Sequence, residues 1–159
     1  MLKKLGIGAY IACVVVVLTI VSWILYGINV TGSGYFKGQG VPFVVLFSIF
    51  AILCEVGAVA IAIFAPKDGT IGKICSFVET ALLIGGIVFL MATGMNIISS
   101  RAQGLGYIFG ADANVAAEFT ADDFNSAVMA IVSAVFYLIS WLVAVVAPFF
   151  GLAKKEEAK

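Results

Sequence analysis

Long apolar runs separated by short polar segments set the pattern of this chain. Four of these runs are long enough to cross a bilayer as helices, because about 20 apolar residues rising 1.5 Å each span its hydrocarbon core. The predicted helices cover residues 5–28, 42–65, 71–97 and 122–147. The pattern therefore predicts an all-α integral membrane protein. Residues 1–159 would form one domain of four transmembrane helices in an antiparallel bundle.

Composition supports a membrane protein and narrows the possible functions. The chain is 63% hydrophobic and 11% charged, whereas soluble domains carry about 25% charged residues. Lipid is therefore the expected environment. The net charge of zero provides no basic surface for nucleic acid. There is no histidine and no metal-binding or nucleophile motif, so we expect no enzyme activity, catalytic residue, metal or cofactor.

The basic residues predict the orientation in the membrane. Lys37 and Arg101 lie on one predicted side. The other lysines lie on the opposite side: Lys3, Lys4, Lys67, Lys73, Lys154, Lys155 and Lys159. Because cytoplasmic segments carry the excess of basic residues, we expect a plasma-membrane protein with both termini in the cytoplasm. The outer loops would be residues 29–41 and 99–121, and residues 149–159 would form a cytoplasmic tail.

Two capping signals lie in the second predicted outer loop. Thr120 followed three residues later by Asp123 is typical of a capping box at a helix start. Asp112 precedes a short segment through Glu118 and has the side chain of an N-cap. We therefore predict a capped fourth helix and a short capped helix before it.

The two halves of the chain carry a similar motif, which we call the GxGY motif. Its two copies lie in the predicted outer loops and consist of Gly32, Gly34, Tyr35 and Gly38, and of Gly104, Gly106, Tyr107 and Gly110. The helix ends before and after the motifs also match. This pattern predicts an internal duplication of two helices plus two, with repeats at about residues 1–66 and 70–148. Both copies would start in the cytoplasm, so they would be parallel repeats.

Small and polar residues follow one face of each predicted helix. In lipid, helices associate through close backbone approach and interhelical hydrogen bonds, so these stripes should face the bundle centre. The stripes comprise Gly8, Ala12, Thr19, Ser22, Tyr26 and Asn29; Ser48, Ala51, Glu55, Ala58, Ala62 and Ala65; Cys75, Glu79, Gly86, Thr93 and Asn96; and Ala130, Ser133, Tyr137, Ser140, Ala144 and Ala147.

Glu55 and Glu79 are the acidic residues inside the apolar runs. An ionised side chain at the bilayer centre costs at least about 2.5 kcal/mol, so each acid needs an explanation. Counted from the turn between their helices, the two acids lie at similar depth near mid-membrane. We expect them to approach each other, with Tyr137 as a third member. Such a group would share a proton, bind a cation or remain neutral as hydrogen-bond donors.

Two functions fit these patterns. The first is an ion- or proton-coupled transporter or channel element with a site at Glu55, Glu79 and Tyr137. The alternative is a non-catalytic tetraspan scaffold or accessory subunit in which the glutamates are structural. A single four-helix bundle has little interior space, so both functions favour a homo-oligomer or a larger membrane complex.

Overall fold

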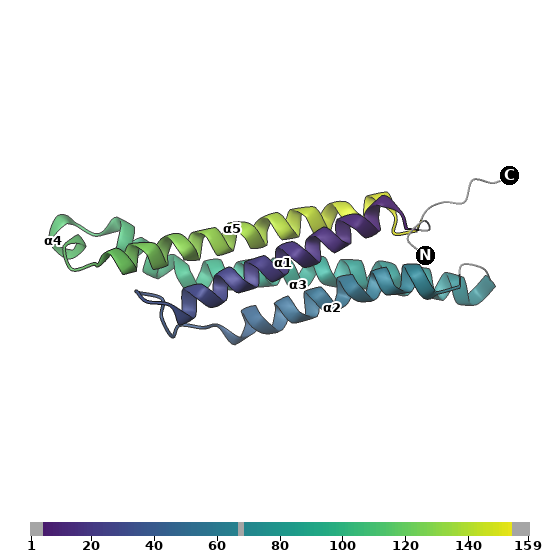
Figure 1. Ribbon diagram of the computed structural model, residues 1–159, viewed down its shortest axis with the longest axis horizontal. Helices are drawn as coiled ribbons and strands as arrows, with labels where there is room; N and C mark the ends of the chain where they lie inside the picture. The colour runs from purple at the N-terminus through teal and green to yellow at the C-terminus, as the bar shows by residue number, and fades with distance from the viewer. Residues whose placement is uncertain (1–4, 67–68, 154–159) are drawn as a thin grey trace.

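The structure is a computed structural model that describes residues 5–66 and 69–153. Its helices in chain order are α1 (Ile7–Thr31), α2 (Pro42–Phe64), α3 (Gly69–Gly110), α4 (Ala113–Ala116) and α5 (Ala121–Phe150). The four long helices lie alongside one another in an elongated bundle (Figure 1). Each of them is long and apolar enough to cross a membrane. The prediction of a multi-pass helical membrane protein is confirmed at this level.

Helices α1 and α5 contact each other along their length. At one end, Gly8 N donates to Gly151 O at 3.1 Å. At the other end, Asn29 Nδ2 donates to Ser126 O at 2.6 Å. We call the first end, where residues 5–8 meet residues 150–153, the terminus end. The opposite end, with residues 29–41 and α4, is the loop end.

Helices α2 and α3 form the second closely packed pair. A Cβ placed on Gly57 would lie 3.3 Å from a methyl group of Leu82, and one on Gly85 would lie 3.3 Å from Cys54 Sγ. Glycines at these positions let the two backbones approach closely, as is common between helices in membranes.

The predicted inward stripes of the first, second and fourth helices are buried. All six residues of the α1 stripe and all six of the α5 stripe are buried, and in α2 all except the half-buried Ala65. In α3, Gly86 and Thr93 are buried, whereas Cys75, Glu79 and Asn96 are half-buried. The small stripe residues allow close contact between the helices. Bulky buried side chains fill the core between them, including Tyr26, Leu90, Ile97 and Tyr137.

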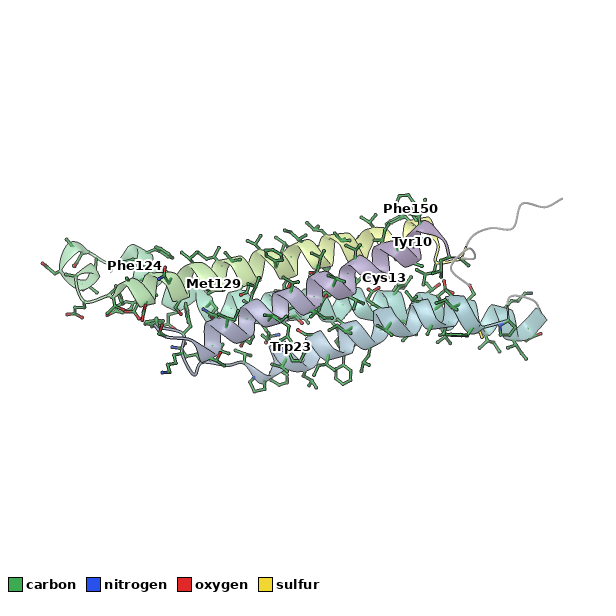
Figure 2. All side chains as sticks on the ribbon, viewed as in Figure 1. Tyr10, Cys13, Trp23, Phe124, Met129 and Phe150 are labelled. Atoms are coloured by element: carbon green, nitrogen blue, oxygen red, sulfur yellow. The ribbon has the colours of Figure 1, made fainter. Side chains whose placement is uncertain are left out.

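Large apolar side chains cover the outside of the bundle. Tyr10 and Phe150, labelled in Figure 2, are exposed. Phe77 and Phe149 are 76% and 83% exposed. In water such a surface would drive aggregation, but it suits contact with lipid or with other apolar helices.

Helix α3 is much longer than the sequence pattern predicts. The predicted helix ends at Ile97 and is followed by a loop, whereas α3 continues without interruption to Gly110. The added turns are stabilised by tertiary packing, because Arg101, Gly104 and Ile108 are buried on one face. Tertiary contacts here outweigh the low helix propensity of the serines and glycines in this segment.

The predicted caps are confirmed. Thr120 Oγ1 accepts from Asp123 N at 3.3 Å, and Asp123 Oδ2 accepts from Thr120 N at 2.8 Å, which is a capping box at the start of α5. Asp112 Oδ1 accepts from Asn114 N at 3.0 Å at the start of α4. Helix α5 runs to Phe150, three residues beyond its predicted end and into the segment predicted as a tail. Residues 151–153 of that tail follow the helix, and residues 154–159 lie outside the described residues.

Candidate functional site

Glu55 is enclosed between α2 and α3. Its side chain is 1% exposed because it lies on the inward stripe of α2 and faces Gly86 of α3. A Cβ on Gly86 would lie 2.7 Å from Glu55 Oε1, so the glycine makes room for the carboxyl group. Neither carboxyl oxygen has a hydrogen-bond partner among residues 5–66 and 69–153.

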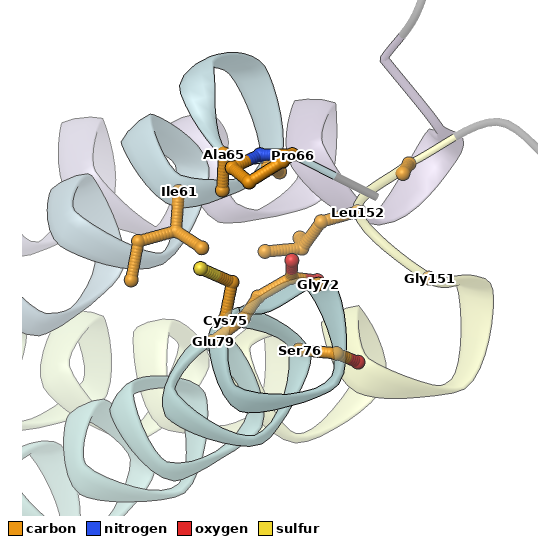
Figure 3. A pocket seen from close by; sticks show the side chains of 11 residues that line it. Ile61, Ala65, Pro66, Gly72, Cys75, Ser76, Glu79, Gly151 and Leu152 are labelled. Atoms are coloured by element: carbon orange, nitrogen blue, oxygen red, sulfur yellow. The ribbon is translucent and has the colours of Figure 1, made fainter. Parts of the chain in front are cut away.

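Glu79 lies at a different level of the bundle. It is half-buried and lines a cavity of about 290 Å³ at the terminus end, together with Ala62, Cys75 and Leu152 (Figure 3). Seven residues of α3 separate Glu79 from the glycine that Glu55 faces, which corresponds to about 10 Å along the helix axis. The structure therefore does not bring the two glutamates together as predicted.

The different levels arise at the connection between α2 and α3. The chain leaves α2 in an extended conformation at Ala65, with φ −75° and ψ 146°. Gly72 and Cys75, which lie in the first two turns of α3, share the terminus-end cavity with Ala65. The first residues of α3 therefore lie beyond the end of α2. The sequence prediction counts residues from the turn along both helices and assumes that α2 ends and α3 begins at the same level. Because α3 begins beyond the end of α2, that count places Glu79 too far toward the middle of the bundle.

Tyr137 forms a polar pair with a different residue of α2. Its hydroxyl group and Ser48 Oγ lie 2.7 Å apart, and either can be the donor. Ser48 precedes Glu55 by seven residues, so this pair lies about 10 Å toward the loop end along α2. Tyr137 is therefore not a member of a carboxylate site. The three predicted site residues occupy three separate levels of the bundle.

Arg101 is the charged residue that sequence reasoning missed. It is 1% exposed, and its Nη2 donates to Gln39 O at 2.8 Å. The guanidinium carbon lies 4.6 Å from the ring centroid of Phe36 and 5.6 Å from that of Tyr26, an arrangement typical of cation–π contacts. Nε and Nη1 have no hydrogen-bond partner within the described parts of the chain.

A signal for this burial is present in the sequence. Arg101 follows Ile97 by four residues and precedes Gly104 by three, so it continues the inward face of α3. The polar segment around it favoured a loop instead, and a loop arginine gives no indication of burial. Only continuation of the helical spacing past Asn96 would have placed Arg101 inside the bundle.

The loop between α1 and α2 is folded into the loop end of the bundle. Phe36 is fully buried, and its backbone N donates to Ser126 Oγ at 3.2 Å. Val41 N donates to the hydroxyl group of Tyr26 at 2.6 Å. These contacts tie the loop to α1 and α5, and Phe36 fills the space between the ends of the helices.

The two GxGY motifs adopt different structures and touch each other. Gly34 and Gly38 in the first motif have φ of 95° and 75°, a conformation that favours glycine. The second motif is helical, in contrast to the predicted outer loop. A Cβ on Gly104 would lie 2.7 Å from ring atoms of both Tyr35 and Phe36. The rings of Tyr35 and Tyr107 lie 6.3 Å apart between centroids. The two motifs therefore pack against each other. The internal duplication of two helices plus two stays a prediction.

Comparison with known proteins assigns no family. No protein-family model, curated protein or solved structure matches this chain.

The chemistry available inside the bundle is limited. In the part of the chain that the structure describes, no three His, Cys, Asp or Glu side chains are grouped so as to hold a metal ion. Cys13, Cys54 and Cys75 are free thiols. The buried polar groups instead form separate contacts at successive levels: Arg101 with the loop, Ser48 with Tyr137, Glu55 beside Gly86, and Glu79 at the terminus-end cavity.

Proposed function

We propose that this protein is a non-catalytic tetraspan subunit that assembles with copies of itself in the plasma membrane. In this proposal its helices alternate in direction across the bilayer and both termini lie in the cytoplasm. The distribution of lysines supports this orientation. The glutamates are structural elements of the bundle.

The separation of the buried polar groups is the observation that carries this proposal. Ser48 and Tyr137, then Glu55, then Glu79 follow one another at intervals of about 10 Å along the helix axes. Ala51 and Ala58, between these levels, are 1% and 0% exposed. Other buried hydroxyl groups of the inward stripes, among them those of Thr19, Ser22 and Ser140, donate to carbonyls of their own helices rather than to one another. An ion or proton passing along the bundle needs polar groups or water at short intervals. The packing between these levels therefore supports a structural role over a conducting one.

A row of phenylalanine rings on the outside of α2 and α3 supports self-assembly. The ring centroids of Phe43 and Phe47 lie 5.7 Å apart, those of Phe47 and Phe89 5.8 Å, and those of Phe89 and Phe50 5.4 Å. Phe43 and Phe50 are 55% and 41% exposed. Exposed aromatic rings can form further aromatic pairs with a second copy, and each such pair contributes about 0.5–1.5 kcal/mol.

The test measures assembly in lipid vesicles. Protein copies that each carry one fluorescent label are placed in vesicles over a wide range of protein-to-lipid ratios. If the protein self-assembles, energy transfer between copies should reach its maximum already at a low density of protein in the membrane. The double variant Phe43→Ala, Phe50→Ala should weaken association by about tenfold, since two aromatic contacts are lost. The matched control, Phe77→Ala with Phe149→Ala, removes two exposed rings outside the row and should associate like the parent protein. Equal association of both double variants, or a monomer at all densities, would refute the proposal.

One observation favours a second candidate, a proton site at Glu55 alone. Its buried carboxyl group has two oxygens without partners in the described structure, and an acid inside a membrane-spanning segment is a candidate for proton binding. Proton uptake by vesicles containing the parent protein is compared with uptake by the Glu55→Gln variant and by the Glu55→Gln, Glu79→Gln double variant. A structural role predicts the same uptake in all three samples. Uptake that disappears with Glu55→Gln would establish the transport function.

A further inference from the structure

An apolar groove lies between α3 and α5 near the loop end. Its volume is about 300 Å³, and it is bounded by residues 97–105 of α3 and 130–138 of α5. The groove exists because Ala102, Ala130 and Ala134 occupy positions where longer side chains would close the space. The other lining residues, apart from Arg101, are leucine, isoleucine and valine.

A second, smaller groove extends the first toward the middle of the bundle. It has a volume of about 150 Å³ and shares Ile98 and Leu138 with the first groove. Together the grooves follow α3 from Leu90 to Leu105, about 22 Å along the helix axis. Half of a bilayer's hydrocarbon core is about 15 Å thick. The combined groove is therefore long enough for a lipid acyl chain that enters from one leaflet.

The groove has one charged lining residue, and the polar atoms left without partners beside it are donors. Arg101 lines its outer part, and Nε and Nη1 of this side chain have no partner in the described residues. Trp141 lines the inner part, and its Nε1 is also without a partner there. No aspartate or glutamate lines either groove. A buried donor left unbonded is costly, and an anionic oxygen would form the stronger charge-assisted bond with the guanidinium group.

Arg101 also lies at a suitable depth for a lipid headgroup. It contacts the ring of Tyr26, which is five residues before the end of α1, about 7 Å along that helix. The guanidinium group therefore lies in the part of the bundle toward the loop end. The apolar groove extends from Arg101 to Leu105 on that side and to Leu90 toward the middle of the bundle.

We propose that this groove binds one anionic phospholipid from the surrounding bilayer. One acyl chain lies along α3 and α5, and the lipid phosphate accepts hydrogen bonds from Nε and Nη1 of Arg101. The inference does not depend on self-assembly, because the phenylalanine row lies on α2 and α3 rather than between α3 and α5.

The experiment uses the full chain in nanodiscs that contain equal amounts of phosphatidylglycerol and phosphatidylcholine. Native mass spectrometry after release should find one retained phosphatidylglycerol, preferred over phosphatidylcholine by about tenfold, as expected for a charge-assisted hydrogen bond. Millimolar inorganic phosphate should not displace it, because phosphate lacks an acyl chain for the groove.

Two variants separate the groove from the charge. Ala134→Phe fills the groove and leaves Arg101 in place, and it should reduce retention of phosphatidylglycerol by at least about tenfold. Arg101→Gln should retain a lipid but lose the preference for phosphatidylglycerol. Val17→Phe, at a 60% exposed position of α1, is the matched control and should behave like the parent protein. Thermal unfolding in phosphatidylcholine alone verifies that each variant is folded.

Three outcomes would overturn the inference. The first is equal retention of both lipids by the parent protein. The second is unchanged retention by a folded Ala134→Phe variant. The third is displacement by inorganic phosphate alone, which would indicate an anion site without a lipid. If Arg101→Gln does not fold, the comparison of Ala134→Phe with Val17→Phe still decides the result.

Discussion

The two GxGY segments, residues 32–38 and 104–110, have similar sequences but different backbone conformations. In the first segment, Gly34 and Gly38 use positive φ angles, and the chain turns back between α1 and α2. In the second, the same pattern continues α3 as a regular helix. Gly106 has no atom within 4 Å of a Cβ placed on it, whereas a Cβ on Gly34 would collide with the backbone oxygen of Asp122. The contacts around each glycine, rather than the motif itself, determine its role.

The largest effect is expected at Phe36 in the first segment. Phe36→Ala removes a fully buried ring and should lower the free energy of unfolding by about 3–5 kcal/mol, since it leaves a cavity between the helix ends. Phe109→Ala, in the second segment, truncates a 54% exposed ring and should change stability by less than about 0.5 kcal/mol. Denaturant titration in detergent micelles measures both values. Similar losses in the two variants would show that the first segment does not fill the bundle end.

Gly34→Ala should have the next largest effect. The added methyl group meets the backbone of Asp122, and φ of 95° is unfavourable for alanine. Together these should cost about 2–4 kcal/mol. Gly38→Ala has the same kind of backbone strain but no neighbour within 4 Å, so it should cost only about 1–2 kcal/mol. The difference between the two variants, measured by the same titration, isolates the close contact with α5.

Gly104→Ala tests the contact between the two segments. Its methyl group would lie 2.7 Å from ring atoms of Tyr35 and Phe36, which must shift at a cost of about 1–2 kcal/mol. Because those rings anchor the loop, trypsin should cleave after Lys37 faster than in the parent protein. An unchanged cleavage rate would mean that the loop does not depend on the close approach at Gly104.

Gly106→Ala should give the smallest effect and the opposite sign. Because the position is helical and open, alanine should raise the free energy of unfolding by about 0.5–1 kcal/mol. Gly34 occupies the equivalent position of the first segment, so the pair of variants compares one motif position in two structures. Destabilisation by Gly106→Ala would contradict a helix in the second segment.

The inward faces of the helices could be predicted because lipid makes the pattern simple. Small and polar residues at three- and four-residue spacing have few alternatives to the bundle interior, and the stripes of α1, α2 and α5 are buried as predicted. The end of α3 could not be predicted in this way. Ser99, Ser100 and Gly104 favour a loop when considered alone. They are helical because Arg101, Gly104 and Ile108, on one face of this segment, are buried against the rest of the bundle.

The candidate site was the least predictable part of the molecule. Glu55 was correctly placed on a buried face, but its partner depends on the register between α2 and α3. That register depends on the extended conformation at Ala65, which the following Pro66 favours, and on the start of α3 at Gly69, which the sequence pattern places at residue 71. Arg101 was missed for a related reason, since its burial depends on a loop that lies 62 positions away in the chain.

The pairing of α1 with α5 also determines the order of assembly in time. The hydrogen bond from Asn29 to Ser126 joins residues 97 positions apart. Gly57 and Leu82, which connect α2 with α3, are only 25 positions apart. A ribosome adds about 5–20 residues per second, so roughly 5 to 20 seconds pass between the synthesis of Asn29 and that of Ser126. During this interval the polar face of α1 lacks its final partner, and any factor that shields it should act within those seconds.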